Sequence, residues 1–126
     1  MKKKIFIVDD DPTSLKAVEG VLTLHGYEVQ ASSHAQDIEN KVRAFAPQLI
    51  VMDLMMPNVD GNQAVQRLQK NPVLNEIPVV FLTSLQTKDE ERGLEVEINV
   101  DNRSYRTLTK PLDAKALVAA IRELTA

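Results

Sequence analysis

Short apolar runs alternate with longer amphipathic stretches along this chain. The apolar runs cover residues 5–8, 27–31, 49–52, 79–82 and, more weakly, 105–108. Runs of this length are typical of strands, and nearly continuous apolarity is typical of strands buried on both faces. The stretches between the runs are long enough for helices. The pattern therefore predicts a parallel sheet with helices on both of its faces.

Capping residues and glycines mark the ends of the predicted helices. Asp11 followed by Pro12 is typical of an N-cap and a first helical position. Gly26 stands where a left-handed C-terminal cap belongs, and Asp113 is placed to cap the last helix. Gly20 falls inside the first helix, where a glycine costs about 1 kcal/mol relative to alanine. We interpret Gly20 as a point of close packing.

Two further pairs have the spacing of capping boxes and indicate helix starts: Ser33 with Gln36, and Thr87 with Glu90. Five strands and five helices then fit the length of the chain. The apolar strands 1, 3 and 4 should be central. Right-handed crossovers and a switch point beside strand 1 predict a doubly wound, flavodoxin-like α/β sheet with strand order 2-1-3-4-5.

Composition narrows the class of protein. The chain has 126 residues, of which 44% are hydrophobic and 26% charged, and we expect one domain over residues 1–126. A net charge of −3 argues against direct nucleic-acid binding. The absence of cysteine excludes disulfides and thiolate catalysis. No apolar run approaches the roughly 18 residues of a membrane span. We expect a cytoplasmic protein.

Polar residues follow the apolar runs where the predicted strands end. Asp9 and Asp10 follow the first run, Asp53 the third, Thr83 the fourth and Lys110 the fifth. The carboxyl ends of parallel strands meet at one edge of a sheet, so these residues should converge on one crevice. Three carboxylates in such a place indicate a divalent cation, a phosphoryl group, or both.

In these motifs the chain resembles the response-regulator receiver domain of two-component signalling. The matching segments are Val8-Asp9-Asp10, Asp53 to Gly61, Leu82-Thr83-Ser84 and Thr109-Lys110-Pro111. Each segment is a weak or moderate signal alone, but together, in the right order at strand ends, they are a strong one. In that family a sensor histidine kinase or phosphotransfer protein passes a phosphoryl group from a histidine to the aspartate corresponding to Asp53.

The resemblance implies a Mg²⁺ site around that phosphoacceptor. Asp10 and Asp53 would each supply an oxygen, the backbone carbonyl of Met55 a third, and Asp9 would act through a metal-bound water. Few protein ligands completed by water and phosphate are usual for Mg²⁺. Without the ion, carboxylates about 4 Å apart repel by roughly 4 kcal/mol at an effective dielectric constant near 20. The metal-free site should therefore be destabilising.

The resemblance also implies how the phosphate is read. Lys110 would pair first with Asp53 and then with a phosphate oxygen, and Thr83 would donate its hydroxyl to another. Thr83 would then move toward the phosphate and an aromatic of strand 5 would rotate inward. The output surface would be helix 4, strand 5 and helix 5. It would bind a downstream protein effector or a fused output domain. A phosphorylation-dependent homodimer is a further alternative. Such a chain is a self-phosphorylating switch and turns over no external metabolite.

The stretch before Lys110 departs from the family pattern. The switch aromatic should lie three residues before this lysine, where Thr107 stands. Tyr105 lies two residues earlier on the same strand face, so Tyr105 is our candidate for the switch. Residues 96–100 alternate between apolar and polar as a strand does. We expect a short helix 4 followed by an extended segment or a loop.

Two other functions remain open from the sequence. The chain could be an interaction module of the same fold that signals without phosphate, given the altered strand 5. It could also be a Mg²⁺-dependent phosphohydrolase with an aspartate nucleophile. That class usually carries a second acid two residues after the nucleophile, where this chain has Met55.

Overall fold

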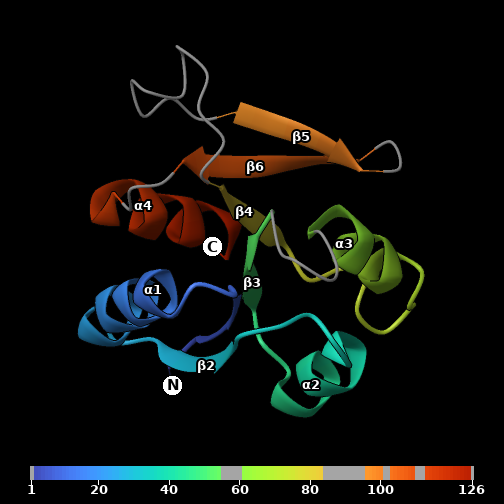
Figure 1. Cartoon of the computed structure of the whole chain (residues 1–126), viewed down its shortest axis with the longest axis horizontal. Helices are drawn as coiled ribbons and strands as arrows, with labels where there is room; N and C mark the ends of the chain where they lie inside the picture. Colours follow the sequence, from blue (N-terminus) through green and yellow to red (C-terminus); the bar gives the residue numbers. More distant parts are fainter. Residues whose placement is uncertain (1, 55–60, 84–95, 101–102, 110–112, 126) are drawn as a thin grey trace.

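The computed structural model describes residues 2–54, 61–83, 96–100, 103–109 and 113–125, with the backbone alone at 61–62, 83 and 96–99. In these ranges strands and helices alternate through most of the chain (Figure 1). The elements are β1 (Lys4–Val8), α1 (Pro12–Leu24), β2 (Glu28–Ser32), α2 (Ile38–Phe45), β3 (Leu49–Asp53), α3 (Gly61–Gln69), β4 (Val79–Thr83), β5 (Val96–Val100), β6 (Arg103–Thr109) and α4 (Ala114–Leu124).

The six strands in the described ranges form one sheet in the order β2-β1-β3-β4-β6-β5. The pairs from β2 to β6 are parallel, and they follow the order 2-1-3-4-5 that the sequence predicts. The doubly wound fold is therefore confirmed. β5 is an additional strand, antiparallel to β6, at the edge of the sheet. It covers the residues 96–100 whose alternation indicated an extended segment.

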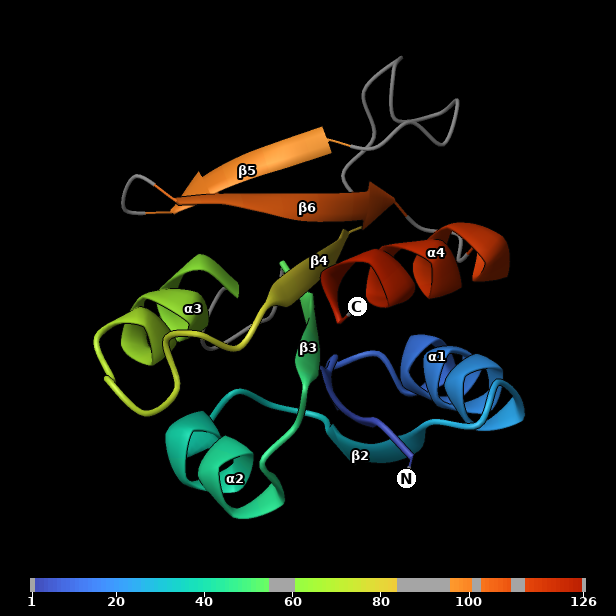
Figure 2. The same cartoon turned by 180° about the vertical axis from the view of Figure 1, so that it is seen from behind.

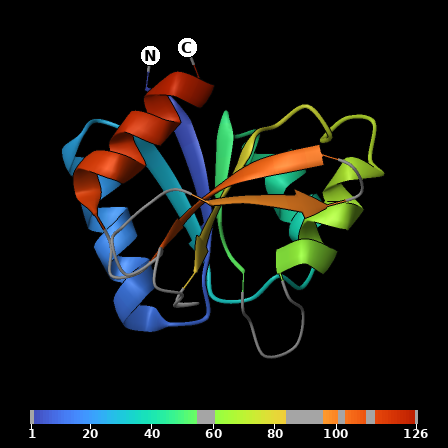
Figure 3. The ribbon, with the colours of Figure 1, turned by 90° about the horizontal axis from the view of Figure 1, so that it is seen from above.

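Helices cover both faces of the sheet (Figures 1 and 2). The view from above shows α1 and α4 on one side of the strands and α2 and α3 on the other (Figure 3). Each side has its own apolar core, because successive side chains of a strand point to opposite faces. Phe6, Ile50 and Phe81 pack on the α2/α3 side, whereas Ile7 and Val51 pack on the α1/α4 side. The three central strands are thus buried on both faces, as expected.

The predicted caps of the first and last helices are confirmed. The Asp11 carboxylate accepts a hydrogen bond from the backbone N–H of Thr13 at 3.1 Å, and Pro12 begins α1. The Asp113 carboxylate accepts one from the N–H of Ala116 at 3.2 Å. Gly26 has a φ of +86°, the left-handed conformation expected after α1.

The capping box predicted at Ser33 and Gln36 is wrong. The second helix begins at Ile38, and its N-cap is Asp37, with a φ of 60° and no side-chain capping bond. Ala35 and Ile38 are both buried in the α2/α3 core, so packing rather than capping chemistry determines where this helix begins. Thr87, Glu90 and the fourth predicted helix, which they would begin, lie outside the described residues.

The interpretation of Gly20 as a close-packing point is also wrong. Gly20 is exposed on α1, and a Cβ placed there would meet no heavy atom within 4 Å among the atoms that the structure describes.

Replacing Gly20 by alanine should therefore stabilise the protein by about 0.5–1 kcal/mol, because alanine loses less backbone entropy in a helix. The free energy of unfolding in urea, followed by circular dichroism, measures this. Gly26→Ala is the matched control and should destabilise by about 1–2 kcal/mol, since its φ is positive. A destabilising Gly20→Ala substitution would contradict the open surroundings of this position.

Candidate functional site

The topology creates a crevice beside β1. From β1 the chain runs through α1 to β2 on one side, and then returns through α2 to β3 on the other. The two connections cover opposite faces of the sheet, so they diverge at the carboxyl end of β1. Ligand sites of open α/β sheets lie at such a switch point. Asp9 and Asp10 follow β1 directly, and Asp53 is the last residue of β3.

Three aspartates meet in this crevice. One carboxylate oxygen from each of Asp9, Asp10 and Asp53 lies within 4.8 Å of the other two. Asp9 and Asp53 are buried, with 1% and 4% of their surface exposed, whereas Asp10 is the more exposed member. The predicted convergence of the first acidic pair with the central aspartate is confirmed.

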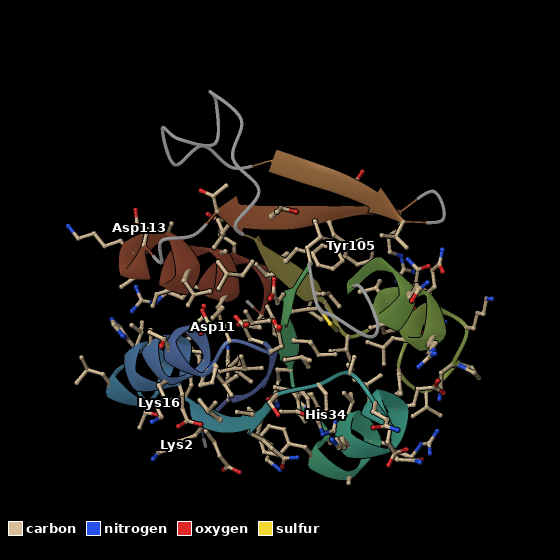
Figure 4. The ribbon with its side chains drawn as sticks, in the orientation of Figure 1. Lys2, Asp11, Lys16, His34, Tyr105 and Asp113 are labelled. Carbon is tan, nitrogen blue, oxygen red and sulfur yellow. The ribbon has the colours of Figure 1, made fainter. Side chains whose placement is uncertain are left out.

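Backbone hydrogen bonds hold the first acid in place. The N–H of Asp9 donates to the carbonyl of Ser32 at the end of β2, at 3.1 Å. The Asp9 carboxylate in turn accepts from the N–H of Asp11 at 2.9 Å. Asp11 is the N-cap of α1, and Figure 4 shows it at the start of that helix. The start of α1 and the orientation of the Asp9 carboxylate are therefore coupled.

The sheet ladder positions the central acid. Asp53 is opposite Leu82 of β4 in the parallel register. The following residue, Leu54, donates its N–H to the Leu82 carbonyl at 3.2 Å. The backbone of β3 is thus held against β4 up to and beyond Asp53. The position of the Asp53 backbone, from which its carboxylate extends, is therefore fixed.

The electrostatics of this cluster favour a cation. Full charges within 4.8 Å repel by at least roughly 3 kcal/mol per pair at an effective dielectric constant near 20. Carboxylates are hard oxygen donors, the type that Mg²⁺ and Ca²⁺ prefer. The residues that the structure brings together therefore fit a divalent cation.

Of the predicted site residues beyond the three aspartates, the structure describes the backbone of Thr83 and the whole of Tyr105. Thr83 ends β4, one residue beyond the partner of Asp53, and lies opposite Thr109 of β6. Its backbone is thus at the same edge of the sheet, as predicted. Lys110 follows Thr109 in sequence, but it lies outside the described residues, and so does Met55.

Tyr105 is buried within the core on the α2/α3 side, with 7% of its surface exposed. Its ring packs edge-on against Phe81, with centroids 5.7 Å apart. Its hydroxyl accepts a hydrogen bond from the side-chain amide of Gln69 at 2.5 Å, and the same amide donates to the Val100 carbonyl at 3.1 Å. Figure 4 shows Tyr105 on the side of the sheet that carries α3. Gln69 was missed by the sequence analysis, because a polar residue ending an amphipathic helix carries no signal of an inward contact.

Thr107 shares the strand face of Tyr105, as expected from their spacing, and is 1% exposed. Its hydroxyl finds no hydrogen-bond partner within the described part of the chain. A small polar side chain therefore occupies the position where the family pattern has an aromatic ring. The aromatic ring that β6 contributes to the α2/α3 core is that of Tyr105, two residues earlier.

The chain is similar in sequence and in structure to known proteins. The sequence model of the response regulator receiver domain matches residues 5–122. The protein PilH of Pseudomonas aeruginosa is 33% identical over 123 residues, which cover 98% of each chain. The DNA-binding dual master transcriptional regulator RpaA of Synechocystis sp. is 35% identical, over 96% of this chain and 48% of the relative. A response regulator from Desulfuromonas acetoxidans has a TM-score of 0.78 at 27% identity, covering 97% of this chain and 95% of that one.

The chain belongs to the response regulator receiver domain family. It is a receiver domain with an acidic pocket formed by Asp9, Asp10 and Asp53. It spans about half the length of several curated relatives, 54% and 48% in two of them, and nearly all of PilH. Within the described ranges, no helix combines the length and hydropathy that crossing a membrane requires.

Removing one of the three charges tests whether the pocket carboxylates repel one another. In the absence of divalent cations, Asp10→Asn should stabilise the protein by about 1–2 kcal/mol, because one of three close negative charges is removed. The same variant should gain less stability than the wild type when Mg²⁺ is added, because the ion no longer relieves that repulsion. Urea unfolding with and without millimolar Mg²⁺ measures both effects.

Glu28→Gln is the matched control, since it removes one negative charge at the exposed start of β2. It should leave the Mg²⁺ dependence unchanged. Equal stability of wild type and Asp10→Asn without metal, together with an equal gain from Mg²⁺, would rule out mutual repulsion in the pocket.

Proposed function

We propose that this chain accepts a phosphoryl group on Asp53 from the phosphohistidine of a sensor histidine kinase or phosphotransfer protein. The reaction depends on Mg²⁺ and switches a protein-interaction surface. The observation that carries this proposal is the meeting of three carboxylates within 4.8 Å, with Asp53 buried at a strand end. Such a cluster costs stability, and a bound cation and phosphoryl group explain why it is there.

Asp53 is the nucleophile. One of its carboxylate oxygens attacks the phosphorus atom, the new O–P bond forms, and the P–N bond to the donor histidine breaks. The electron pair of the broken bond remains on the imidazole nitrogen, and Asp53 becomes an acyl phosphate. A carboxylate is a weak nucleophile, so its position counts. The β3–β4 ladder on both sides of Asp53 supports that positioning.

Asp10, Asp53 and the backbone carbonyl of Met55 would hold Mg²⁺, and Asp9 would contribute through a water bound to the ion. When bound, the ion neutralises the carboxylates and the oxygens of the incoming phosphoryl group. The Asp9 carboxylate already accepts the N–H of Asp11, which orients it before any ion binds. This orientation is the contribution of the chain itself to the site.

Lys110 and Thr83 bind the phosphoryl group once it has moved. The Lys110 ammonium is a point charge on a flexible stem, suited to pair with Asp53 and then with a phosphate oxygen. The Thr83 hydroxyl donates to a second oxygen. Water later hydrolyses the acyl phosphate, so the chain resets its own signal and acts on no external metabolite.

The switch runs from Thr83 to the output surface of predicted helix 4, strand 5 and helix 5. Strand 5 corresponds to β6 and helix 5 to α4, whereas helix 4 lies outside the described residues. A full switch from 1:99 to 99:1 requires about 5.5 kcal/mol of differential stabilisation. Two charge-assisted contacts to phosphate, each of roughly 1.5–3 kcal/mol, approach that value. Tyr105 is the residue whose surroundings change in the switch. Its ring packs against Phe81 of β4, and its hydroxyl accepts a hydrogen bond from Gln69 of α3. Movement of β4 changes its surroundings.

Residues 1–126 form one receiver domain, which acts in the cytoplasm. Its phosphorylation state is read by a protein that contacts it, either a separate effector or a fused output domain. Relatives support both arrangements, since PilH has nearly the length of this chain whereas RpaA is about twice as long. A phosphorylation-dependent homodimer would use the same surface. Direct binding to nucleic acid or membrane is no part of the proposal.

One observation favours a second candidate, an interaction module that signals without phosphate. Thr107 stands where the family has its switch aromatic, and β5 lies beside β6, so the usual output surface is altered. A phosphohydrolase is disfavoured, since Met55 stands where that class usually has its second acid.

Asp53→Asn should abolish phosphorylation. After incubation with acetyl phosphate or phosphoramidate and Mg²⁺, intact mass spectrometry of the wild type should show one phosphoryl adduct. The variant should show none, because an amide cannot form the acyl phosphate. Glu28→Gln, the control with an equal change of charge, should be modified like the wild type.

The same experiment separates the alternatives. An unmodified wild type that still binds Mg²⁺ would reject phosphorylation and favour the phosphate-independent module. Multiple turnover of a phosphomonoester would favour the hydrolase. An adduct that persists in Asp53→Asn would place the phosphoacceptor elsewhere.

Phosphorylation should change the surroundings of one of the two tyrosines. The chain has only Tyr27 and Tyr105, and Tyr27 packs at the α1/β2 side, away from β6. The ring resonances of Tyr105 in NMR spectra should shift on addition of phosphoramidate and Mg²⁺, whereas those of Tyr27 should stay in place. Lys110→Ala should still be phosphorylated but show a smaller Tyr105 shift. Unchanged Tyr105 resonances in a fully phosphorylated sample would remove Tyr105 from the switch.

A further inference from the structure

Among the strands that the structure describes, β5 is the last one at its side of the sheet. It pairs with β6 on one side, and the described part of the chain places no strand on its other side (Figure 1). A strand edge presents unpaired N–H and C=O groups to which another strand can bind. Edge strands are usually protected by charged side chains, most often lysine, by proline, by a bulge or by a covering segment. β5 has one charged residue, Glu97. The sequence Val-Glu-Ile-Asn-Val of β5 contains no lysine or proline, and its register with β6 runs without interruption.

The register identifies the residues whose backbone faces outward. Val100 lies opposite Arg103, and only residues 101 and 102 connect them. A two-residue connection closes on a pair whose backbone groups face each other, and the facing alternates along an antiparallel ladder. Val96, Ile98 and Val100 therefore direct their N–H and C=O groups toward β6. Glu97 and Asn99 direct theirs away from β6.

The sequence of this strand is complementary to itself. An antiparallel pair of β5 strands centred on Ile98 places Ile98 opposite Ile98 of a second copy. Val96 then lies opposite Val100, and Glu97 opposite Asn99, so no two like charges face each other. The outward-facing residues Glu97 and Asn99 become the hydrogen-bonded pairs, which is the arrangement that an antiparallel ladder requires.

The two faces of the sheet also continue across this pair. Val96 and Ile98 are in register with Thr107 and Tyr105, whose side of the sheet is the one packed on α3. Glu97 and Asn99 are in register with Arg106 and Ser104, on the opposite face. Antiparallel neighbours share a face, so apolar positions adjoin apolar ones and polar positions adjoin polar ones. A two-fold axis through Ile98 generates this arrangement with a single, self-complementary contact.

We propose that two copies of this chain associate edge to edge through β5, forming one sheet that continues through both molecules. The association needs no phosphate, and it uses a strand that lies beyond the five parallel strands of the fold. A second copy is favoured over an unrelated peptide because each position of β5 meets a compatible residue of the same sequence.

Charge changes at position 99 test this pairing. Asn99→Glu would place two like-charged pairs across the two-fold axis, and Asn99→Lys would place two oppositely charged pairs there. Sedimentation equilibrium of the unphosphorylated chain should show a wild-type dimer. We expect the dissociation constant to rise by about tenfold in Asn99→Glu and to fall several-fold in Asn99→Lys, from two cross-strand charge pairs. Both shifts should shrink in high salt.

Gln30→Glu is the matched control. It adds the same charge at an exposed position of β2, the opposite edge of the sheet, and should leave the dissociation constant unchanged. Asn99→Pro is a second variant. It removes the outward-facing N–H of residue 99 but leaves every N–H that β5 donates to β6. It should abolish the dimer and keep a cooperative thermal unfolding transition.

Three results would overturn the proposal. The first is a wild type and an Asn99→Lys variant that remain monomeric at all concentrations tested. The second is a dimer that Asn99→Glu and Gln30→Glu weaken equally, since its interface would lie elsewhere. The third is a dimer that forms only after phosphorylation. None of these results bears on whether Asp53 accepts a phosphoryl group.

Discussion

The repulsion among three aspartates at one end of the sheet is the constraint to which the rest of this structure is adapted. Asp9 and Asp53 are almost completely buried, yet their carboxylates lie beside each other and beside Asp10. Buried like charges would separate if the backbone allowed it. Here the β3–β4 ladder holds Asp53, whereas Asp9 is held by the hydrogen bond that its N–H donates to the Ser32 carbonyl and by the one that its carboxylate accepts from the Asp11 N–H. The stability of the two apolar cores therefore maintains a pocket that is unfavourable by itself and that a divalent cation would stabilise.

The distant edge of the sheet carries the chief variation on the family pattern. β5 extends the sheet beyond β6, and the Gln69 amide joins α3 both to the Tyr105 hydroxyl and to the Val100 carbonyl. These contacts connect the strand that carries Tyr105 to the strand that forms the edge. The pocket and the edge are thus parts of one sheet with different tasks. The pocket is determined by charged residues at strand ends, and the edge by a short alternating sequence that pairs with β6 alone among the described strands.

The parallel core of the fold was predictable because its signals are local. Apolar runs marked β1, β3 and β4, and the caps at Asp11, Gly26 and Asp113 have the expected geometry. The errors have physical causes. The start of α2 follows the burial of Ala35 and Ile38 and not the side chains of Ser33 and Gln36. Gly20 faces open space on α1, although glycine inside a helix suggested close packing. In both places tertiary surroundings, which a local motif cannot report, decided the outcome.

The order of residues along the chain by itself indicated which groups can take part in the chemistry, since acids, a threonine and a lysine follow four of the predicted strands. It also determined the strand order, because right-handed crossovers leave few arrangements of alternating strands and helices. The tertiary structure alone decided how close Asp9, Asp10 and Asp53 come, that Gln69 bonds to Tyr105, and that residues 96–100 pair with β6. Distances between residues far apart in sequence depend on how the whole core packs, and no short segment contains that information.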